Sequence, residues 1–182
     1  MNYLCKIPSP LGILTLASDG QNLTGLWLDG QKYFASTLDK DAGNTVEQEL
    51  PLFDDARKWL DQYFSGREPD FHLPLAPAGS EFRQAVWKIL LEIPYGQVIT
   101  YGDIAKRLAV EGNRGNLSAR PVGGAVGHNP ISILIPCHRV VGANGSLTGY
   151  AGGIANKIKL LKLEVVAVEN FTLPVLSVPS AK

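Results

Sequence analysis

The stretch of residues 68–79 restricts the fold of this chain more than any other feature. Its apolar residues have no regular spacing, and it contains three prolines and a glycine: Pro69, Pro74, Pro77 and Gly79. Proline cannot continue the interior of a helix or of a central strand. Neither kind of element can therefore run through this stretch, which we interpret as the linker between two domains.

Three parts of the chain follow from that division. We expect an N-terminal α/β structural domain over residues 1–77 and a C-terminal domain over residues 78–169. Residues 170–182 contain Pro174 and Pro179 and are expected to form a loosely attached tail.

The two halves of the chain carry opposite net charge. Residues 1–80 hold 6 Lys and Arg against 11 Asp and Glu, whereas residues 81–182 hold 11 against 6. A polyanion should therefore bind the second half. Opposite charges would also help the two halves to dock on each other and to stay in solution, so charge alone leaves both interpretations open.

The sequence offers no sign of a membrane segment, a metal site or a disulfide. No apolar run reaches the roughly 18 residues of a membrane span, and the first residues lack the features of a secretory signal. Cys5 and Cys137 are the two cysteines, and with three histidines they form no zinc-type spacing. We expect a soluble protein with reduced thiols, without a metal or a membrane partner, located in the cytoplasm and associated with the nucleoid if prokaryotic.

The first half reads as a short antiparallel sheet followed by one helix. Three strands are predicted at residues 3–7, 13–17 and 23–28, because β-forming runs alternate there with turn signals. A helix is predicted at residues 52–64, where apolar side chains recur at helical spacing. This helix should cover one face of the sheet.

The second half reads as helices with a hairpin between them. Ser80, Thr100 and Ser118 are candidate N-caps of helices that run to about residues 90, 108 and 127. The last two helices predict a helix-turn-helix. Residues 140–148, with the turn signal Asn144-Gly145, predict a hairpin that would form a wing, and a final helix is predicted at residues 154–164.

Cys137 is the candidate nucleophile of the chain. It is followed directly by His138 and Arg139. A free thiol has a pKa of about 8.5, so a nucleophilic cysteine needs a base or a positive charge beside it, and either neighbour can provide one. The alternative is an inert buried cysteine. The glycines of residues 149–153, which let backbone approach a ligand, favour the reactive interpretation.

Residues 82–164 resemble the methylated-DNA–protein-cysteine methyltransferases, also called O6-alkylguanine-DNA alkyltransferases. The matching motifs are, in chain order, Phe82-Arg83, Val86-Trp87, Ile93-Pro94-Tyr95-Gly96, Thr100-Tyr101, Ile104-Ala105, Asn129-Pro130, Ile135-Pro136-Cys137-His138-Arg139-Val140, Gly149-Tyr150, Gly153, Lys157, Leu160-Leu161 and Glu164. The N-terminal part also looks like the first domain of this family. The resemblance implies an α+β fold, with an N-terminal RNase H-like antiparallel sheet and helix and a C-terminal winged helix-turn-helix domain.

The resemblance also implies a DNA repair reaction in which each protein molecule works once. A guanine that carries an alkyl group on O6 is flipped out of duplex DNA, and the cysteine takes the alkyl group irreversibly. The substrate brings the alkyl group, so no cofactor is implied. The implied partner is double-stranded DNA containing alkylated guanine, contacted through the minor groove by a protein that is monomeric in solution. Activity on O4-alkylthymine and cooperative assembly on DNA stay open.

The resemblance assigns chemical roles to five residues. Cys137 would be the nucleophile, and His138 would draw off its proton through a water that Glu164 also holds. Asn129 would order the turn that carries the cysteine. Tyr101 would donate a proton or a hydrogen bond to the purine as negative charge develops on it.

Further residues are implied to contact the DNA. Arg120 would enter the duplex and fill the space left by the flipped nucleotide. The other implied DNA contacts are small residues of the same helix: Ala119, Gly123, Gly124 and Ala125. A smooth helix of this kind cannot read base edges in the major groove, which fits lesion scanning in the minor groove. The residues implied to line the base pocket are Pro136, Val140, Tyr150, Ala151 and Gly152.

Two other functions compete with alkyl transfer. A non-catalytic relative would bind alkylated DNA and recruit other factors, but such proteins replace the cysteine that is present here. A thiol hydrolase would use Cys137 and His138, but no third orienting group stands at a familiar spacing. Cys5 lies near a position where some relatives have a zinc ligand, and the remaining ligands are missing from the sequence.

Overall fold

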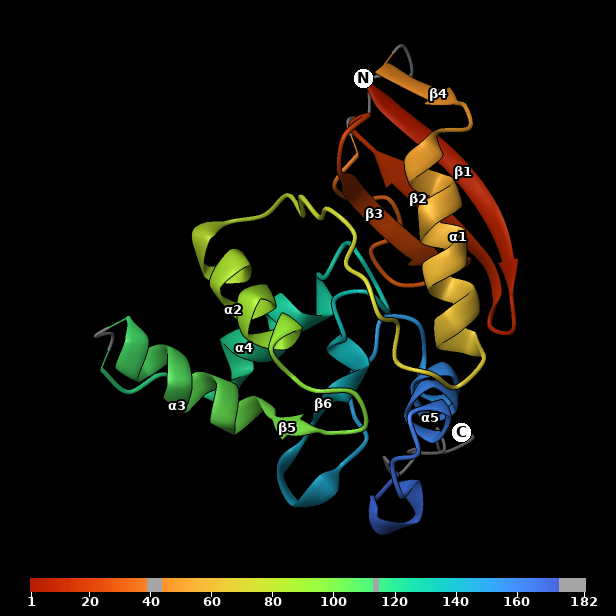
Figure 1. Ribbon diagram of the computed structural model, residues 1–182. Coiled ribbons are helices and arrows are strands. Elements are labelled where there is room, and N and C mark those ends of the chain that lie inside the picture. Colours follow the sequence, from red (N-terminus) through yellow and green to blue (C-terminus); the bar gives the residue numbers. More distant parts are fainter. Residues whose placement is uncertain (39–43, 113–114, 174–182) are drawn as a thin grey trace, which may run out of the picture.

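The computed structural model describes residues 1–38, 44–112 and 115–173. Its N-terminal part is a sheet crossed by one long helix, and its C-terminal part is a group of shorter helices beside that sheet (Figure 1). Within these described ranges, none of the helices has the length and apolar character needed to cross a membrane.

The N-terminal sheet has four strands in the order β3-β2-β1-β4. The strands β1 (Asn2–Ser9), β2 (Gly12–Ser18) and β3 (Leu23–Leu28) form the antiparallel meander that the turn signals predict. Strand β4 (Thr45–Glu47) was not predicted, and it pairs with β1 in parallel. The sheet is therefore mixed at this edge, because β4 returns to β1 from a segment about forty positions away in the sequence.

Helix α1 (Pro51–Phe64) covers one face of this sheet, as predicted (Figure 1). Pro51 begins the helix, where the missing N–H removes no intrahelical hydrogen bond. The side chains that α1 buries lie at helical spacing: Phe53, Ala56, Leu60 and Tyr63. Burial of a large apolar side chain contributes roughly 1.5–3 kcal/mol, so this stripe fixes α1 against the sheet.

The outer edge of β3 joins the two halves of the molecule. Leu23 donates to the carbonyl of Pro74 at 2.8 Å and accepts from the amide of Ala76 at 2.8 Å. Leu26 donates to Pro130 at 2.9 Å and accepts from Ser132 at 2.8 Å. A strand edge that would otherwise be open is thereby paired with the linker and with the segment that leads to Cys137.

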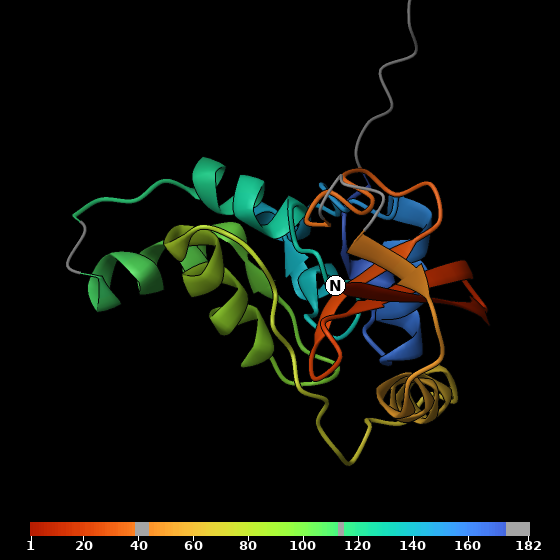
Figure 2. The same ribbon diagram turned by 90° about the horizontal axis from the view of Figure 1, so that it is seen from above.

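The C-terminal helices begin where the sequence predicts. Helix α2 (Glu81–Leu91) is capped by Ser80 and α3 (Tyr101–Glu111) by Thr100, whose hydroxyl accepts from the amide of Asp103 at 3.1 Å. Helix α4 (Ala119–Gly127) begins after Ser118, although that side chain makes no capping hydrogen bond. Helix α5 is Ile154–Leu163. Seen from above, α2, α3 and α4 lie together on the side away from α1 (Figure 2).

The hairpin predicted at residues 140–148 forms only in part. Strand β6 (Val140–Val141) pairs in parallel with β5 (Ile99–Thr100), and Asn144 and Gly145 do form a turn, with positive φ angles of 56° and 72°. After that turn the chain makes one hairpin contact, in which the amide of Gly142 donates to the carbonyl of Ser146 at 2.7 Å, and Leu147 then donates to the carbonyl of Thr172 at 2.9 Å. This contact also ties down the first residues of the predicted tail. The rest of that tail, 174–182, lies outside the described residues.

Candidate active site around Cys137

Cys137 lies in a tight turn that Asn129 holds from inside the protein. The amide nitrogen of Asn129 donates to the carbonyl of Ile135 at 2.8 Å and to the sulfur of Cys137 at 3.1 Å. Its amide oxygen accepts from the backbone N–H of Ile131 at 3.0 Å. Asn129 is itself 3% exposed, so these bonds are sheltered from water. One side chain thus holds the turn together, the place that the resemblance implied for Asn129, and it also points a donor at the sulfur.

The thiol of Cys137 is buried, with only 3% of the residue exposed. Burial raises its pKa, while the hydrogen bond from Asn129 and the charge of Lys157 act in the opposite direction. Lys157 is fully buried, and its ammonium donates to the carbonyls of Val140 and Thr148. Burial lowers the pKa of Lys157 to about 8. The site therefore holds the sulfur as a thiol at rest and has a donor and a cation ready for the thiolate.

His138 is paired with Glu164 directly. Nε2 of His138 lies 2.7 Å from Oε1 of Glu164, and both side chains are fully buried. Arg139 holds the same carboxylate, with Nε 2.8 Å from Oε2 and Nη2 3.0 Å from Oε1. Burial acts to raise the pKa of Glu164, but His138 and Arg139 outweigh it and lower this pKa to about 2. The carboxylate is therefore ionised at neutral pH.

The contact with Glu164 decides which ring nitrogen of His138 can act as a base. Because Nε2 faces a carboxylate oxygen, the ring proton belongs on Nε2, and the lone pair is left on Nδ1. Nδ1 has no hydrogen-bond partner among the described residues. Burial lowers the pKa of His138, so its ring is neutral at rest and able to accept a proton. Glu164 contacts the ring directly, whereas the resemblance implied a carboxylate that holds a water between Cys137 and His138.

Tyr101 is the first residue of α3, and its hydroxyl contacts the loop that follows β6. It donates to the carbonyls of Thr148 at 3.1 Å and Gly149 at 3.2 Å. A Cβ atom at Gly149 would lie 3.1 Å from this hydroxyl, so the glycine leaves room for it. Burial raises the pKa of Tyr101 to about 12, with a smaller effect from the charge of Cys137. Tyr101 is thus a protonated donor near the sulfur.

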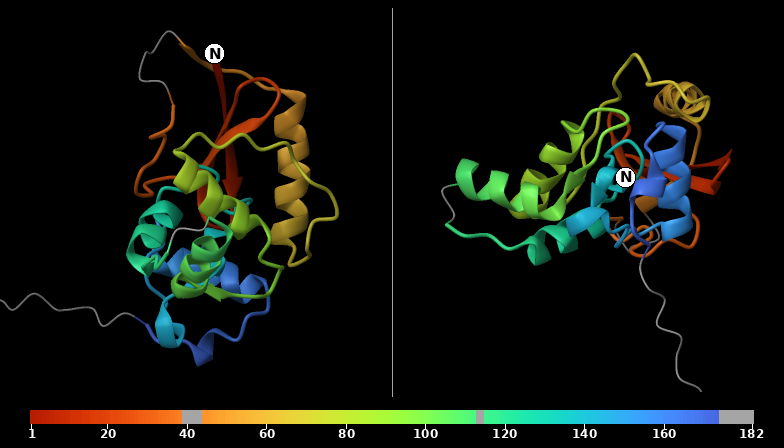
Figure 3. Two further views of the ribbon diagram at one scale, coloured as in Figure 1. Left: turned by 90° about the vertical axis from the view of Figure 1, so that its left-hand side faces the viewer. Right: turned by 90° about the horizontal axis from the view of Figure 1, so that it is seen from below.

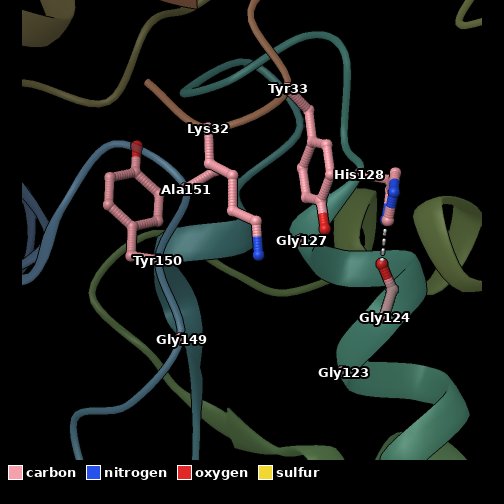
Figure 4. Close-up of a pocket in the computed structure, with 9 residues that line it drawn as sticks. All are labelled: Lys32, Tyr33, Gly123, Gly124, Gly127, His128, Gly149, Tyr150 and Ala151. Atoms are coloured by element: carbon pink, nitrogen blue, oxygen red, sulfur yellow. Dashed lines mark hydrogen bonds between the residues drawn. The ribbon is translucent and has the colours of Figure 1, made fainter. Parts of the chain in front are cut away.

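A cavity of about 240 Å³ opens between the end of α4 and the loop after β6 (Figure 4). Tyr150 and Ala151 line it from the loop, and Lys32 and Tyr33 reach it from the N-terminal half. The ring of Tyr33 stacks on His128, with ring centroids 3.8 Å apart. The backbone N–H of Lys32 donates to the carbonyl of Ala151 at 3.0 Å, which fastens the N-terminal segment to the pocket loop. The cavity is therefore shared by both halves.

Three of the residues predicted for the pocket do not line this cavity. Val140 is fully buried and presents its carbonyl to Lys157, while Pro136 lies on a different hollow beside Arg139. Gly152 supports the pocket indirectly, since a Cβ atom there would lie 2.8 Å from the ring of Tyr150. The glycine therefore leaves room for that ring.

Helix α4 lies beside α3 (Figure 3), and its exposed residues are mostly small. Ala119, Arg120 and Gly124 are exposed, and a Cβ atom at Gly124 would meet no other atom within 4 Å. Gly123 is half-buried and faces the ring of Tyr101. Ala125 corrects the prediction for this helix: it is buried, and its carbonyl accepts from the indole of Trp87 at 2.9 Å. It belongs to the contact between α4 and α2.

The surroundings of Cys5 do not suit a metal ion. Its sulfur lies 2.9 Å from Nη2 of Arg57 and 3.3 Å from Oε1 of Glu49. The guanidinium would repel a cation at this sulfur. Burial and the Glu49 contact raise the pKa of Cys5 to about 11, so it stays a thiol.

Four residues that contact the site received no role from the sequence: Lys32, Tyr33, Lys157 and Tyr63, whose hydroxyl donates to Glu164 at 2.7 Å. Lys157 had a usable signal, because it falls on the apolar stripe of α5 between Ile154 and Leu161. A lysine in that position must bury its charge. The other three come from the N-terminal half, and their local sequence contains nothing that points to a distant cysteine.

Comparisons with known proteins match both halves of the chain to one family. Residues 2–77 match the family model described as 6-O-methylguanine DNA methyltransferase, ribonuclease-like domain. Residues 81–166 match the model described as 6-O-methylguanine DNA methyltransferase, DNA binding domain.

Full-length relatives agree with these matches. The chain is 46% identical over 166 residues to a methylated-DNA–protein-cysteine methyltransferase of Mycobacterium tuberculosis, covering 90% of this chain and 93% of the relative. It is 40% identical to the protein of the same name from Haemophilus influenzae, covering 90% and 87%. Its fold is similar to the crystal structure of Mycobacterium tuberculosis OGT in complex with DNA, with a TM-score of 0.76, 42% identity and 92% and 98% coverage.

Proposed function

The chain belongs to the 6-O-methylguanine DNA methyltransferase family, and we propose that Cys137 is the residue with which it takes the alkyl group from damaged DNA. Its function is DNA repair by methyl transfer from methylated DNA to a cysteine of the protein itself. The assignment of Cys137 rests on one observation. Cys137 directly precedes His138, and Nε2 of His138 lies within hydrogen-bond distance of Glu164. Among the described residues, Cys5 contacts no histidine, and burial and the hydrogen bond to Glu49 raise its pKa to about 11 in spite of Arg57.

The reaction begins with removal of the thiol proton. His138 accepts this proton on Nδ1 through a water molecule, and Glu164 stabilises the imidazolium that forms. Asn129 and Lys157 stabilise the thiolate. The thiolate then attacks the alkyl carbon, the bond between that carbon and O6 breaks, and its electron pair stays on the guanine. Tyr101 donates its proton to the purine as this charge develops, so the base leaves as neutral guanine, and the thiol proton held by His138 replaces the proton of Tyr101 through solvent.

The products explain why the protein acts once. They are an unmodified guanine in DNA and an S-alkylcysteine at position 137. Water does not readily cleave the carbon–sulfur bond of a thioether, so the cysteine is not regenerated. The chemistry requires no cofactor because the substrate supplies the alkyl group. Transfer is therefore stoichiometric.

The geometry of α4 supports a docking mode on DNA. Its exposed face bears small residues, which allow the backbone to approach the minor groove, and Arg120 projects from its first turn. The positively charged half of the chain carries this helix. In this proposal Arg120 fills the space of the flipped nucleotide, and a monomer binds the duplex. Residues 1–77 serve as a structural domain, and residues 78–169 bind DNA and accept the alkyl group.

The cavity between α4 and the loop after β6 is the proposed entry for the flipped base. Tyr150 and Ala151 line it on the side of the loop, and Tyr101 lies next to that loop. Flipping costs roughly a few kcal/mol, and less for a lesion that pairs poorly, so the pocket favours damaged bases. A chromosomal substrate places this activity in the compartment that holds the chromosome, which is the cytoplasm in a prokaryote.

The deciding experiment is mass spectrometry of the protein after incubation with duplex DNA containing O6-methylguanine. We expect one methyl group per molecule, located on the peptide that contains Cys137. Cys137→Ala should give no adduct while it keeps its affinity for DNA. Cys5→Ala is the matched control, since it removes the other cysteine, and it should react like the unchanged protein.

Each competing function predicts a different result. A non-catalytic binder of alkylated DNA would give no adduct in the unchanged protein. A thiol hydrolase would turn over an ester or an amide repeatedly. A methyl group found on Cys5 would overturn the assignment of Cys137.

A further inference from the structure

We propose that Tyr63, which the N-terminal half contributes from α1, is a positioning residue of the alkyl-acceptor site and holds the Glu164–His138 pair in its working arrangement. The inference rests on the proposed function and extends the site into a part of the chain to which no chemistry has been assigned.

The hydroxyl of Tyr63 lies within hydrogen-bond distance of both members of the pair. It donates to Oε1 of Glu164 at 2.7 Å and lies 3.2 Å from Nε2 of His138. Nε2 and Oε1 are themselves 2.7 Å apart. All three residues are fully buried in the structure. Figure 1 shows why this contact is available: the end of α1 lies next to α5, and Glu164 directly follows α5.

The three atoms allow one consistent assignment of protons. A phenol has a single hydroxyl proton, and Tyr63 uses it to donate a hydrogen bond to the carboxylate, which can only accept. The oxygen of Tyr63 then faces Nε2 of His138 as an acceptor. Nε2 is therefore surrounded by acceptors, from Tyr63 and Glu164, and it carries the ring proton. Tyr63 thus favours the tautomer in which Nδ1 is free to act as a base.

Tyr63 is able to keep this role at neutral pH. Burial raises its pKa well above the usual value, and the charge of Glu164 adds to the effect, so the hydroxyl stays protonated. The ring is held on two sides by Trp59, stacked at 5.4 Å, and by Tyr95, edge-on at 6.1 Å. A ring packed in this way cannot turn its hydroxyl away from the pair.

Several charged or titratable groups act on His138, and they set the direction of the expected effect. Glu164 favours the imidazolium, whereas Arg139, Lys157 and burial disfavour it. Tyr63 donates a hydrogen bond to the carboxylate of Glu164. This bond partly offsets the negative charge of Glu164, so the carboxylate stabilises the imidazolium of His138 less strongly. Without this donor, Glu164 attracts the imidazolium more strongly, and His138 becomes easier to protonate.

Tyr63→Phe tests the inference because it removes one oxygen atom and keeps the ring. The measurement is the single-turnover rate of methyl transfer from duplex DNA across a range of pH. We expect a rate about tenfold lower at neutral pH, because the ring tautomer with a free Nδ1 loses one of its two acceptors. The acid limb should move to higher pH, because a protonated His138 cannot act as a base. The adduct per molecule at long times should stay at one, and DNA affinity should stay unchanged.

Tyr95→Phe is the matched control. Tyr95 packs against Tyr63, but its hydroxyl donates to the carbonyl of Leu163 at 3.2 Å and not to the pair. This variant should keep the acid limb of the unchanged protein. A purely structural role of Tyr63 would lower the reactive fraction equally at every pH, and a limb that stays in place would overturn the inference.

A second measurement needs no variant. Nitrogen NMR of the unchanged protein labelled in histidine should show His138 protonated on Nε2, and protonation on Nδ1 would contradict the assignment. Failure of the inference is distinct from failure of the proposed function, since the latter requires that the unchanged protein forms no adduct at all.

Discussion

The side-chain amide of Asn129 donates to the sulfur of Cys137 at 3.1 Å, across eight positions in the chain. The same nitrogen donates to the carbonyl of Ile135, so the donor that shapes the turn is also the donor that faces the nucleophile. Folding of the turn and activation of the sulfur are therefore coupled through one side chain.

Asn129→Ala should damage both stability and reactivity. It leaves the carbonyl of Ile135 and the N–H of Ile131 without their buried partner. An unmade buried hydrogen bond costs about 1–3 kcal/mol, so we expect a loss of about 3 kcal/mol in the free energy of unfolding, measured in urea. Asn156→Ala is the control, since Asn156 donates one bond, to Gly152. Equal losses in the two variants would contradict the special place of Asn129.

Arg120→Ala should separate capture of the lesion from the chemistry. Arg120 is exposed on α4, away from the buried groups around Cys137. We expect transfer from duplex DNA to slow by about tenfold or more, because an arginine contact to DNA contributes about 1–3 kcal/mol. The reaction with free O6-benzylguanine should keep its rate. Arg83→Ala, in α2, provides a control for loss of positive charge. If both substrates slow equally in the Arg120 variant, that residue has no role in flipping.

Lys157→Met should make the thiol of Cys137 harder to ionise. The variant removes a buried positive charge that favours the thiolate. An increase of one unit in the pKa of Cys137 would lower the thiolate fraction about tenfold, and iodoacetamide labelling at neutral pH measures this fraction. Lys159→Met, an exposed change on the same helix, should react like the unchanged protein. A labelling rate that does not change would show that Lys157 only supports the carbonyls of Val140 and Thr148.

Glu164→Gln should alter how stability depends on pH. The pKa of Glu164 is lowered from 4.5 to about 2, so its ionised form stabilises the fold above pH 4.5, and this stabilisation is lost as the pH falls toward 2. The difference corresponds to about 3 kcal/mol. Urea unfolding at a series of pH values should show this loss in the unchanged protein and a flatter profile in Glu164→Gln.

The control for that profile is Glu169→Gln, which changes an exposed carboxylate. His138 also makes the free energy of unfolding fall with falling pH, in a range above that of Glu164. Its folded pKa is lowered, so the neutral ring stabilises the fold above the unfolded pKa of about 6.5, and this part fades on acidification. A Glu164→Gln profile as steep as that of the unchanged protein below pH 4.5 would refute the assignment to this carboxylate.

Local signals were sufficient for most of the elements. Thr100 and Ser80 are caps whose hydroxyls meet their own helices within three residues, and the stripe from Phe53 to Tyr63 follows one helix. Such features depend on neighbours in the sequence, so the sequence alone predicts them. The resemblance to a known family supplied Asn129 and Glu164, which no local pattern ties to Cys137.

The predictions that failed concern contacts between distant segments. After Asn144-Gly145, Leu147 pairs with Thr172, and β4 pairs with β1. Each of these paired segments is too short to be recognised as a strand from its sequence. Tyr63 meets Glu164 across 101 positions. The spacing of side chains along the sequence does not indicate such long-range contacts, because they form only when the two halves pack together.

The paired edge of β3 has a consequence for the integrity of the molecule. Leu23 and Leu26 share four main-chain hydrogen bonds with residues 74–76 and 130–132. If a protease cleaved the chain between Gly66 and Leu73, the two fragments would therefore stay associated under native conditions and separate only in denaturant. The peptide link itself is then dispensable for shape, and the reactive sulfur would keep its surroundings in a molecule made of two pieces.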